Sequence, residues 1–397
     1  MLNWKERLKL KGGSIAAART LAVEPSPIRK LVDAISATPG VVGLHAGEPD
    51  FDTPAHIKQA ATEALNAGYT HYTNTAGISE LREAIAQKLR RENGVDVAPE
   101  NEVLVTHGGY AAIYVSLQAL INLGDEVLLI EPAWTYDGFI ALAGGIKVPC
   151  ALHGPGFELT RGALESKVSD TTKLILVSSP NNPTGNMLSK EELEIVAEVA
   201  RRRNLLVLSD EVYEKLVYDG LTHYSIASFP GMSDRTITVN SFSKTYAMTG
   251  WRIGYIAASK EITTAIKKVI AYGYGCINAA AQKAALEALT GPQDCVKGML
   301  KEYDHRRHLI VKGLNEISGI ECKKPEGAFY AFANVSSFKL SSQEFATMLL
   351  QKAKVATIPG SAFGSSGEGY LRISFATSQE NIVEGLDRIR KFVGVLR

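Results

Sequence analysis

The chain has 397 residues, of which 45% are hydrophobic, and it carries 43 Lys and Arg residues against 42 Asp and Glu residues. This size and composition predict a globular protein with two domains, or with one large domain and a smaller one. The formal net charge of +1 excludes an overall field that would draw the chain to nucleic acid or to an anionic membrane.

The cysteines and the N-terminal residues indicate a reducing compartment. Cys150, Cys276, Cys295 and Cys322 show no CxxC spacing, which argues against a metal cluster or a disulfide framework. We expect them to be small buried side chains. The first residues, MLNWKERLKLKGG, lack an apolar signal core, and no run of about 18 apolar residues occurs in the chain. We therefore expect a cytoplasmic protein with no membrane segment and no metal site.

Short apolar runs alternate with longer amphipathic runs between residues 100 and 242. The predicted strands are EVLVT (102–106), DEVLLIE (125–131), KLILVSS (173–179), LLVLSDE (205–211) and TITVNSF (236–242). Helical spacing of apolar residues occurs at 111–123 and 190–204. This alternation predicts an α/β fold, with a mostly parallel sheet and helices on both of its faces.

The last third of the chain has a different pattern. Segments 323–335 and 369–376 are typical of strands, and 342–353 is typical of a helix, which together indicate a smaller α+β domain. Residues 1–50 show no alternation of their own. We place the large domain at 51–285 and assign 1–50 and 286–397 to the small domain.

Residues with potential chemistry follow several of the predicted strands. Ligands of open α/β sheets bind at the carboxyl ends of strands, so these residues form one candidate site. Gly108, Gly109 and Tyr110 open a helix whose first N–H groups would favour a phosphate, although a Gly-Gly pair is also ordinary turn chemistry. Trp134 could stack on a flat ring or simply pack in the interior.

Polar side chains follow the next two strands. Asn182, in the loop PNNPTG, could present its amide to an oxygen atom or could form a tight Asn-Pro turn. Asp210 lies at a strand end and Tyr213 follows three residues later, so both side chains would share a face if the segment turned helical. The alternative for Asp210 is a helix cap.

The stretch SFSKTYAMTGWRIGY (241–255) follows the last of these strands. Lys244 at an apolar sheet edge could have a lowered pKa and act as an amine nucleophile, whereas a lysine in isolation is usually a solvated side chain. Arg252 could bind a phosphate together with the hydroxyls of Ser241 and Ser243. An amine, phosphate-binding groups, a flat ring, a carboxylate and a phenol together suit pyridoxal phosphate.

The chain resembles the class I aminotransferases of fold type I from about residue 10 to its C-terminus. The most specific motif is S-F-S-K-x-x-A-M-x-G-x-R-x-G, present at 241–254. Supporting motifs are GEPDFDTP (47–54), HYTNTAGISELREAIA (71–86), PNNPTG (180–185), SDEVYE (209–214) and PGSAFGSSGEGYLRIS (359–374).

The resemblance implies a role for each matched residue. Lys244 would form the Schiff base with the cofactor, Asp210 would pair with its pyridinium nitrogen, and Tyr213 would bond the ring oxygen O3′ together with Asn182. Trp134 would stack on the ring. The phosphate would be held by Gly108, Gly109, Tyr110, Ser241, Ser243 and Arg252, and the substrate by Arg372, Gly47, Trp134 and Asn182.

The implied reaction is a ping-pong amino-group transfer from an L-amino acid to a 2-oxo acid, by resemblance usually 2-oxoglutarate. Lys244 would also move the Cα proton once the amino acid has displaced it from the cofactor. Tyr72 resembles the tyrosine that reaches the cofactor phosphate of the neighbouring subunit, which implies a homodimer with shared sites.

The amino donor stays open between aspartate and an aromatic or neutral amino acid. Aspartate-using bacterial relatives commonly carry a lysine at the position of Tyr110, and this chain does not, which leaves aspartate specificity open. A pocket with Tyr110, Tyr272 and Tyr274 nearby could favour an aromatic or neutral amino acid. Tyr272 and Tyr274 could border the same pocket or could pack at a dimer interface. Lys11 or Arg19 could still supply a contact to a distal carboxylate.

Two other functions are compatible with parts of the pattern. A lyase or synthase acting at Cβ or Cγ would use the same Lys244, Asp210 and Arg252. An amino-acid-sensing regulator would need a DNA-binding domain, and no basic recognition helix is apparent. The glycine-rich segment 364–369 is a candidate for movement on domain closure.

Overall fold

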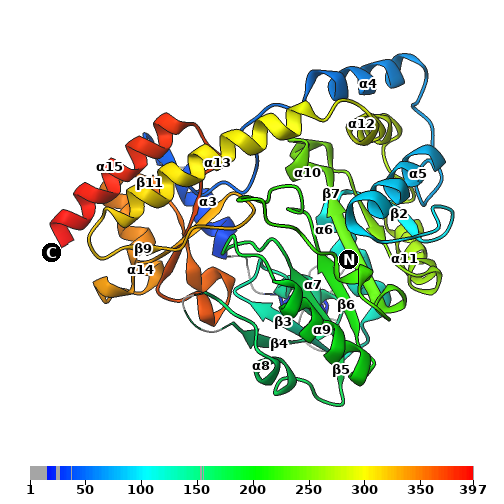
Figure 1. The fold of residues 1–397 in the computed structure, drawn as a ribbon, viewed down its shortest axis with the longest axis horizontal. Helices are drawn as coiled ribbons and strands as arrows, with labels where there is room; N and C mark the ends of the chain where they lie inside the picture. The colour runs from blue at the N-terminus through cyan, green and yellow to red at the C-terminus, as the bar shows by residue number, and fades with distance from the viewer. Residues whose placement is uncertain (1–15, 24–26, 37, 153, 155, 397) are drawn as a thin grey trace, which may run out of the picture.

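The computed structural model describes residues 16–23, 27–36, 38–152, 154 and 156–396. A seven-stranded sheet lies at its centre (Figure 1). The strand order is β2 (Val103–Thr106), β8 (Gly254–Ala257), β7 (Thr236–Ser241), β6 (Leu206–Asp210), β5 (Thr172–Ser178), β3 (Glu126–Glu131) and β4 (Ile146–Ala151). Neighbouring strands run parallel except at β8, which is antiparallel to both β2 and β7. The predicted mostly parallel sheet is confirmed.

Helices cover both faces of this sheet because its strands are apolar on both sides. Val127 and Leu129 point to one face and Leu128 and Ile130 to the other, and all four are buried. The first face packs against α6 (Gly108–Leu120), α7 (Asp137–Leu142) and α11 (Lys260–Gly273). The second packs against α4 (Ala55–Asn66), α5 (Ser79–Lys88), α8 (Arg161–Glu165), α9 (Lys190–Arg203) and α12 (Ala279–Thr290).

The limits of α9 follow from local sequence signals. The Ser189 hydroxyl accepts a hydrogen bond from Glu192 N at 3.1 Å, and the Glu192 carboxylate accepts one from Ser189 N at 2.8 Å. This capping box satisfies backbone donors at the helix start. Asn204 ends the helix in the left-handed conformation, with φ 52°. The predicted helix at 190–204 is therefore confirmed to within one residue.

A second, four-stranded antiparallel sheet forms the smaller part of the molecule. Its order is β12 (Ile358–Pro359), β13 (Tyr370–Ser374), β10 (Tyr330–Asn334) and β9 (Glu321–Cys322). It shares a core with α13 (Asp294–Asn315), α14 (Ser342–Met348) and α15 (Gln379–Leu396). In Figure 1, α13 runs from beside the helices of the large sheet to this second sheet.

The N-terminal segment contacts both parts. Strand β1 (Val42–Gly43) pairs in parallel with β11 (Val355–Ala356) of the C-terminal region. Helix α2 (Ala18–Leu21) packs against α7, and α3 (Pro27–Ser36) follows it. The domain limits at 50 and 285 stay a prediction.

The remaining elements are short. They are the π-helical turns η1 (Leu89–Asn93) and η6 (Leu349–Ala353), the short α10 (Phe242–Thr245), and the 3₁₀ turns η2 (Ile226–Ser228), η3 (Ser233–Arg235), η4 (Thr249–Trp251), η5 (Ser336–Phe338), η7 (Gly360–Phe363) and η8 (Ser365–Gly367). The predicted helix at 342–353 is thus α14 continued by η6.

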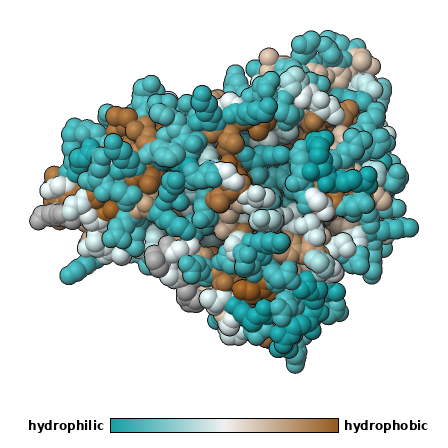
Figure 2. Space-filling model, in the orientation of Figure 1, coloured by the Kyte–Doolittle hydropathy of each residue, from teal (hydrophilic) through white to brown (hydrophobic). Residues whose placement is uncertain are grey.

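The surface of the molecule is mainly polar on one face (Figure 2). Figure 2 shows a largely hydrophilic face with separate small hydrophobic patches. Among the described helices, none has the length and apolar character needed to cross a membrane.

All four cysteines are free thiols. Cys150 and Cys322 are buried as expected, but Cys276 and Cys295 are partly exposed, so the expectation of burial is wrong for these two.

Candidate active site

One cavity of about 260 Å³ opens at the carboxyl ends of the parallel strands. Most of the residues selected from the sequence line it. They are Gly47, Gly109, Tyr110, Trp134, Asn182, Asp210, Tyr213, Ser241, Ser243, Lys244 and Arg252. The lining also contains residues that sequence reasoning missed, including Glu48, Tyr136, Ser178, Thr249 and Tyr330.

Lys244 lies in the short α10, directly after β7. Its Nζ donates a hydrogen bond to the carbonyl oxygen of Gly47. Burial lowers the pKa of Lys244, and the positive charges of Arg372 and Arg252 lower it further, while Glu48 opposes the shift. The resulting pKa is about 8, so about a tenth of this amine is neutral and nucleophilic at pH 7, far more than for an ordinary lysine.

The segment around Lys244 is tied to the loop 47–54. The Thr53 hydroxyl donates to Ala247 O at 2.6 Å and accepts from Trp251 Nε1 at 2.9 Å. The Thr249 hydroxyl donates to Glu48 at 3.1 Å. These contacts show how two motifs that are about 200 residues apart together form the wall of the cavity.

The anion-binding end of the cavity combines hydroxyls, a helix N-terminus and a guanidinium group. Ser241 donates to the Ser243 hydroxyl at 2.9 Å, and α6 begins at Gly108. Gly108 has φ 78°, and a Cβ there would lie 2.8 Å from Arg252 Nη2. Arg252 donates to two backbone carbonyls, at 2.7 and 3.5 Å, and forms no ion pair with a carboxylate of the described residues. This set of donors suits a phosphate.

Asp210 ends β6 beneath the cavity. Burial raises its pKa to about 6, although the Tyr136 hydroxyl, which donates to Oδ2 at 2.7 Å, opposes the shift. A nearby cation would restore the ionised form. Tyr136 lies two residues after Trp134 in the same loop, so its closeness to a selected residue was a sequence signal for a place in the cavity. The segment after Asp210 forms a turn rather than a helix, yet Tyr213 still faces the same cavity.

Arg372 lies in β13 and is 1% exposed, beside the cavity rather than in its lining. Its Nη1 donates to Asn182 Oδ1 at 3.1 Å and its Nη2 to His45 O at 2.6 Å. Its Nε has no hydrogen-bond partner among the described residues, and no carboxylate of those residues pairs with it. A buried guanidinium of this kind is a candidate for binding a carboxylate from a ligand.

Aromatic side chains form another wall. Trp134 Nε1 donates to the Tyr110 hydroxyl at 3.0 Å, and the Tyr110 ring meets Phe139 edge to face at 5.1 Å between centroids. The Arg372 guanidinium lies 5.8 Å from the centroid of the Trp134 ring. The aromatic wall therefore adjoins the candidate carboxylate site.

Some selected residues lie away from the cavity. Tyr72 is 98% exposed and Tyr272 is 96% exposed, whereas Tyr274 packs on the His107 ring at 4.5 Å. Arg19 is exposed on α2, and Lys11 lies outside the described residues. A role for Tyr72 across a subunit interface stays a prediction.

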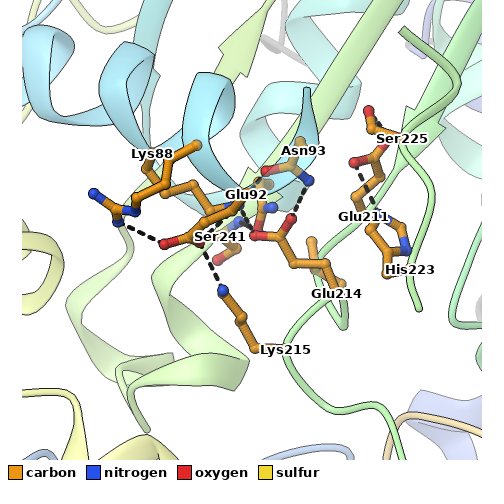
Figure 3. A network of polar contacts seen from close by, with 12 residues as sticks. Lys88, Glu92, Asn93, Glu211, Glu214, Lys215, His223, Ser225 and Ser241 are labelled. Atoms are coloured by element: carbon orange, nitrogen blue, oxygen red, sulfur yellow. Dashed lines mark hydrogen bonds and ion pairs between the residues drawn. The ribbon is translucent and has the colours of Figure 1, made fainter. Parts of the chain in front are cut away.

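A buried ion pair between Lys88 and Glu214 lies next to the site, outside the lining of the cavity. In the segment 210–214, Asp210 and Tyr213 face the cavity while Glu214 points away from it. Lys88 donates to Glu214 and, at 2.8 Å, to Asn93 Oδ1, and Asn93 Nδ2 donates to Glu214 Oε2 at 2.6 Å (Figure 3). Burial alone would raise the pKa of Glu214. The charges of Lys88 and His223 and the hydrogen bonds from Lys88 and Asn93 together outweigh burial and lower the pKa to about 2.

Glu211 has its own buried partners on the same side. Its carboxylate accepts hydrogen bonds from Ser209 at 2.9 Å and Ser225 at 2.8 Å and contacts His223 Nε2 at 3.1 Å (Figure 3). Burial lowers the pKa of the His223 imidazole, but the hydrogen bond and charge of Glu211 and the charge of Glu214 together outweigh burial and raise it. Glu211 and His223 lie close to Glu214, but Lys88 already neutralises that carboxylate, which favours a hydrogen-bond network over a metal site.

The fold and the cavity define a class of protein. An amine with a lowered pKa, an uncompensated arginine among phosphate-type donors, and a buried carboxylate at the base of one cavity fit pyridoxal phosphate. The close approach of Gly108 to Arg252 is consistent with a cradle built for a phosphate. These features indicate an enzyme of the pyridoxal-phosphate-dependent class.

Comparisons with known proteins give the family. The model of the family "Aminotransferase class I and II" matches residues 39–389. The chain is 46% identical to an aspartate aminotransferase of Pyrococcus abyssi and 44% identical to an aromatic-amino-acid aminotransferase of Thermococcus litoralis. Each match covers 93% of this chain and 96% of the relative. The crystal structure of the aspartate aminotransferase of Rhizobium meliloti superposes with a TM-score of 0.93 at 38% identity, covering 96% of this chain and 99% of that one.

The chain belongs to the class I and II aminotransferase family. Its fold is fold type I, and its enzyme class is that of the pyridoxal-phosphate-dependent aminotransferases. The resemblance in the motifs is confirmed at the level of family, fold and enzyme class.

Proposed function

We propose that the protein binds pyridoxal phosphate through Lys244 and transfers the amino group of an L-amino acid to a 2-oxo acid, 2-oxoglutarate being the expected acceptor. The observation that carries the proposal is the position of Lys244. Its amine, with a pKa of about 8, lies in one cavity with Asp210 and Arg252.

The residues of the cavity would hold the cofactor at three points. Arg252, Ser241 and Ser243 would bind its phosphate, and Gly108, Gly109 and Tyr110 would contribute from the start of α6. Asp210 would pair with the ring nitrogen, which restores the ionised form that burial disfavours. Asn182 and Tyr213 would bond the ring oxygen, and Trp134 would stack on the ring.

The reaction also needs a base and a carboxylate site. When bound, the cofactor serves as an electron sink for the bond to Cα. Lys244, once displaced by the amino acid, would take the Cα proton and return it, so that the two half-reactions form a ping-pong cycle. Arg372 would hold the α-carboxylate, with Gly47, Trp134 and Asn182 beside it.

The lining favours an aromatic or neutral amino donor over aspartate. Tyr110 lies where aspartate-using relatives commonly have a lysine, and its hydroxyl already accepts a bond from Trp134. Glu48 adds a negative charge to the lining, and Lys244 and Arg252 are the basic side chains among the described residues that line the cavity. The side-chain carboxylate of aspartate would therefore find no basic side chain in the described lining other than the two assigned to the cofactor.

We extend the proposal to the assembly and location. The 98% exposure of Tyr72 supports a homodimer in which this side chain reaches the phosphate of the partner's cofactor. The pairing of β1 with β11 supports the division into 51–285 and the combined 1–50 and 286–397. A cytoplasmic location is proposed from the free thiols.

The test begins with the purified protein and the cofactor. We expect an absorbance band above about 400 nm that changes on addition of an amino acid. With 2-oxoglutarate, a panel of phenylalanine, tyrosine, leucine and aspartate should yield one 2-oxo acid per glutamate formed. Lys244→Ala should lose the band and nearly all turnover. Near wild-type turnover by this variant would refute the assignment, and ammonia or a Cβ-substituted product without glutamate would favour the lyase alternative.

A further inference from the structure

Tyr330 joins two parts of the site that belong to different sheets. It lies at the start of β10, and its side chain is fully buried at the cavity wall. Its hydroxyl lies 2.7 Å from the hydroxyl of Tyr213, which follows β6 of the large sheet. Burial raises the pKa of both phenols, so both are neutral and each has one proton to donate.

The ring of Tyr330 has a second contact. Tyr330 and Arg372 lie diagonally across the antiparallel pair β10 and β13, in which Phe332 is opposite Arg372. The Arg372 guanidinium lies 4.5 Å above the centroid of the Tyr330 ring. This cation–π contact supports an arginine that has no carboxylate partner among the described residues.

The backbone of Tyr330 is fixed by the surrounding loops. A Cβ at Gly185, in the loop PNNPTG, would lie 2.7 Å from the Tyr330 carbonyl oxygen, so only glycine permits this approach. A Cβ at Gly47 would lie 3.0 Å from the Tyr330 hydroxyl. Close packing therefore holds the Tyr330 backbone against Gly185 and the phenol against Gly47.

We propose that Tyr330 is a positioning residue that couples the carboxylate site at Arg372 to the oxygen-binding hydroxyl of Tyr213. The inference rests on the proposed function. If Tyr213 donates its proton to the cofactor oxygen, its own oxygen accepts the proton of Tyr330. Hydrogen bonds in such a chain strengthen one another, so Tyr330 would increase the donor strength of Tyr213 without contacting the cofactor oxygen.

Tyr330→Phe tests the hydroxyl because it keeps the ring. A weaker donor stabilises an anionic cofactor oxygen less, so the pH midpoint of the absorbance change of the cofactor-loaded protein should rise by about 0.5 to 1 pH unit. The turnover number should fall several-fold, and KM for the amino acid should change less than twofold. An unchanged midpoint would overturn the coupling.

Tyr330→Leu tests the ring. Loss of the cation–π contact with Arg372 should raise KM for the amino acid to at least ten times the value for Tyr330→Phe. Equal KM values for the two variants would overturn this part of the proposal.

A double variant separates coupling from general damage. Because Tyr330 acts through Tyr213, the midpoint of Tyr213→Phe combined with Tyr330→Phe should equal that of Tyr213→Phe alone. Additive shifts would overturn the proposal. Tyr303→Phe is the matched control, because Tyr303 is fully buried in the same core and its hydroxyl has no hydrogen-bond partner among the described residues. Its midpoint should equal that of the wild type.

Failure of this inference is distinguishable from failure of the proposed function. A wild-type protein that neither binds pyridoxal phosphate nor forms glutamate from 2-oxoglutarate would refute the proposed function and, with it, the role assigned to Tyr330. A wild-type protein that does both, with a Tyr330→Phe midpoint equal to its own, would refute the inference alone.

Discussion

The buried pair of Lys88 and Glu214 gives a prediction that does not depend on the cofactor. Glu214→Gln removes the negative charge but keeps an oxygen for the bond from Asn93. The shift of the Glu214 pKa from 4.5 to about 2 corresponds to about 3 kcal/mol of folding stability at pH 7. Breaking one partner of a buried pair has a similar cost, about 3 to 5 kcal/mol, because a charge is left uncompensated.

The assay is thermal unfolding of the cofactor-free variants at pH 7. With an unfolding entropy of about 2 cal/mol/K per residue, a loss of about 3 kcal/mol lowers the midpoint temperature by about 4 °C. Lys88→Met should have a comparable effect. The double variant should cost clearly less than the two single changes together, because it leaves no unpaired charge. Asp294→Asn, which breaks the exposed pair with Lys297, is the control and should leave the midpoint unchanged.

The stabilisation by the ionised Glu214 decreases as the pH falls. Because the folded-state pKa of Glu214 lies below its unfolded value, the stabilisation is complete above about pH 4.5 and is lost as the pH falls toward 2. The difference between the wild type and Glu214→Gln should therefore narrow below pH 4.5. Single variants that match the wild type at pH 7, or an additive double variant, would refute the reasoning.

Two further predictions concern ligand binding. Arg372→Lys keeps the charge but loses the planar donor set that bonds Asn182 and His45, so KM for the amino acid should rise at least tenfold in steady-state assays, and an unchanged KM would place the carboxylate elsewhere. Gly108→Ala introduces a Cβ 2.8 Å from Arg252 at φ 78°, so equilibrium dialysis should show at least tenfold weaker binding of pyridoxal phosphate, and wild-type affinity would argue against a phosphate cradle.

Strands β2, β3, β5, β6 and β7 were predictable from sequence because they are short apolar runs between helical patterns. Strand β4 was missed because Lys147 and Pro149 interrupt the apolar run of this edge strand. Strand β8 was missed because it follows Arg252 within two residues and was included in the functional motif. Its antiparallel direction depends on pairing with β2, about 150 residues away.

The cavity was predictable where its residues follow strands, and much less so where tertiary packing places them. Asp210 ends β6 and Lys244 follows the end of the neighbouring strand β7, so strand order brings them together. Tyr330 comes from the second sheet, and only the docking of that sheet puts its hydroxyl beside Tyr213. The pairing of Lys88 with Glu214 spans 126 residues and has no periodic signal in the sequence.

The arginines that lower the pKa of Lys244 also connect ligand binding with its basicity. Arg372 and Arg252 both oppose protonation of the amine, and neither has a carboxylate partner among the described residues. An anion bound at either guanidinium would cancel part of that repulsion and raise the pKa of Lys244 from about 8 toward its ordinary value.

The amine would therefore become a stronger base once a carboxylate occupies the site, which is when the proposed reaction would require it to accept the Cα proton. In the cofactor-free protein, labelling of the Lys244 peptide by an amine-reactive reagent, followed against pH by mass spectrometry, should shift to higher pH when 3-phenylpropionate or inorganic phosphate is added. The shift with 3-phenylpropionate should vanish in Arg372→Lys if this arginine is the receptor. An unchanged labelling profile with both anions would show that burial alone, and not the two arginines, sets the pKa of the lysine.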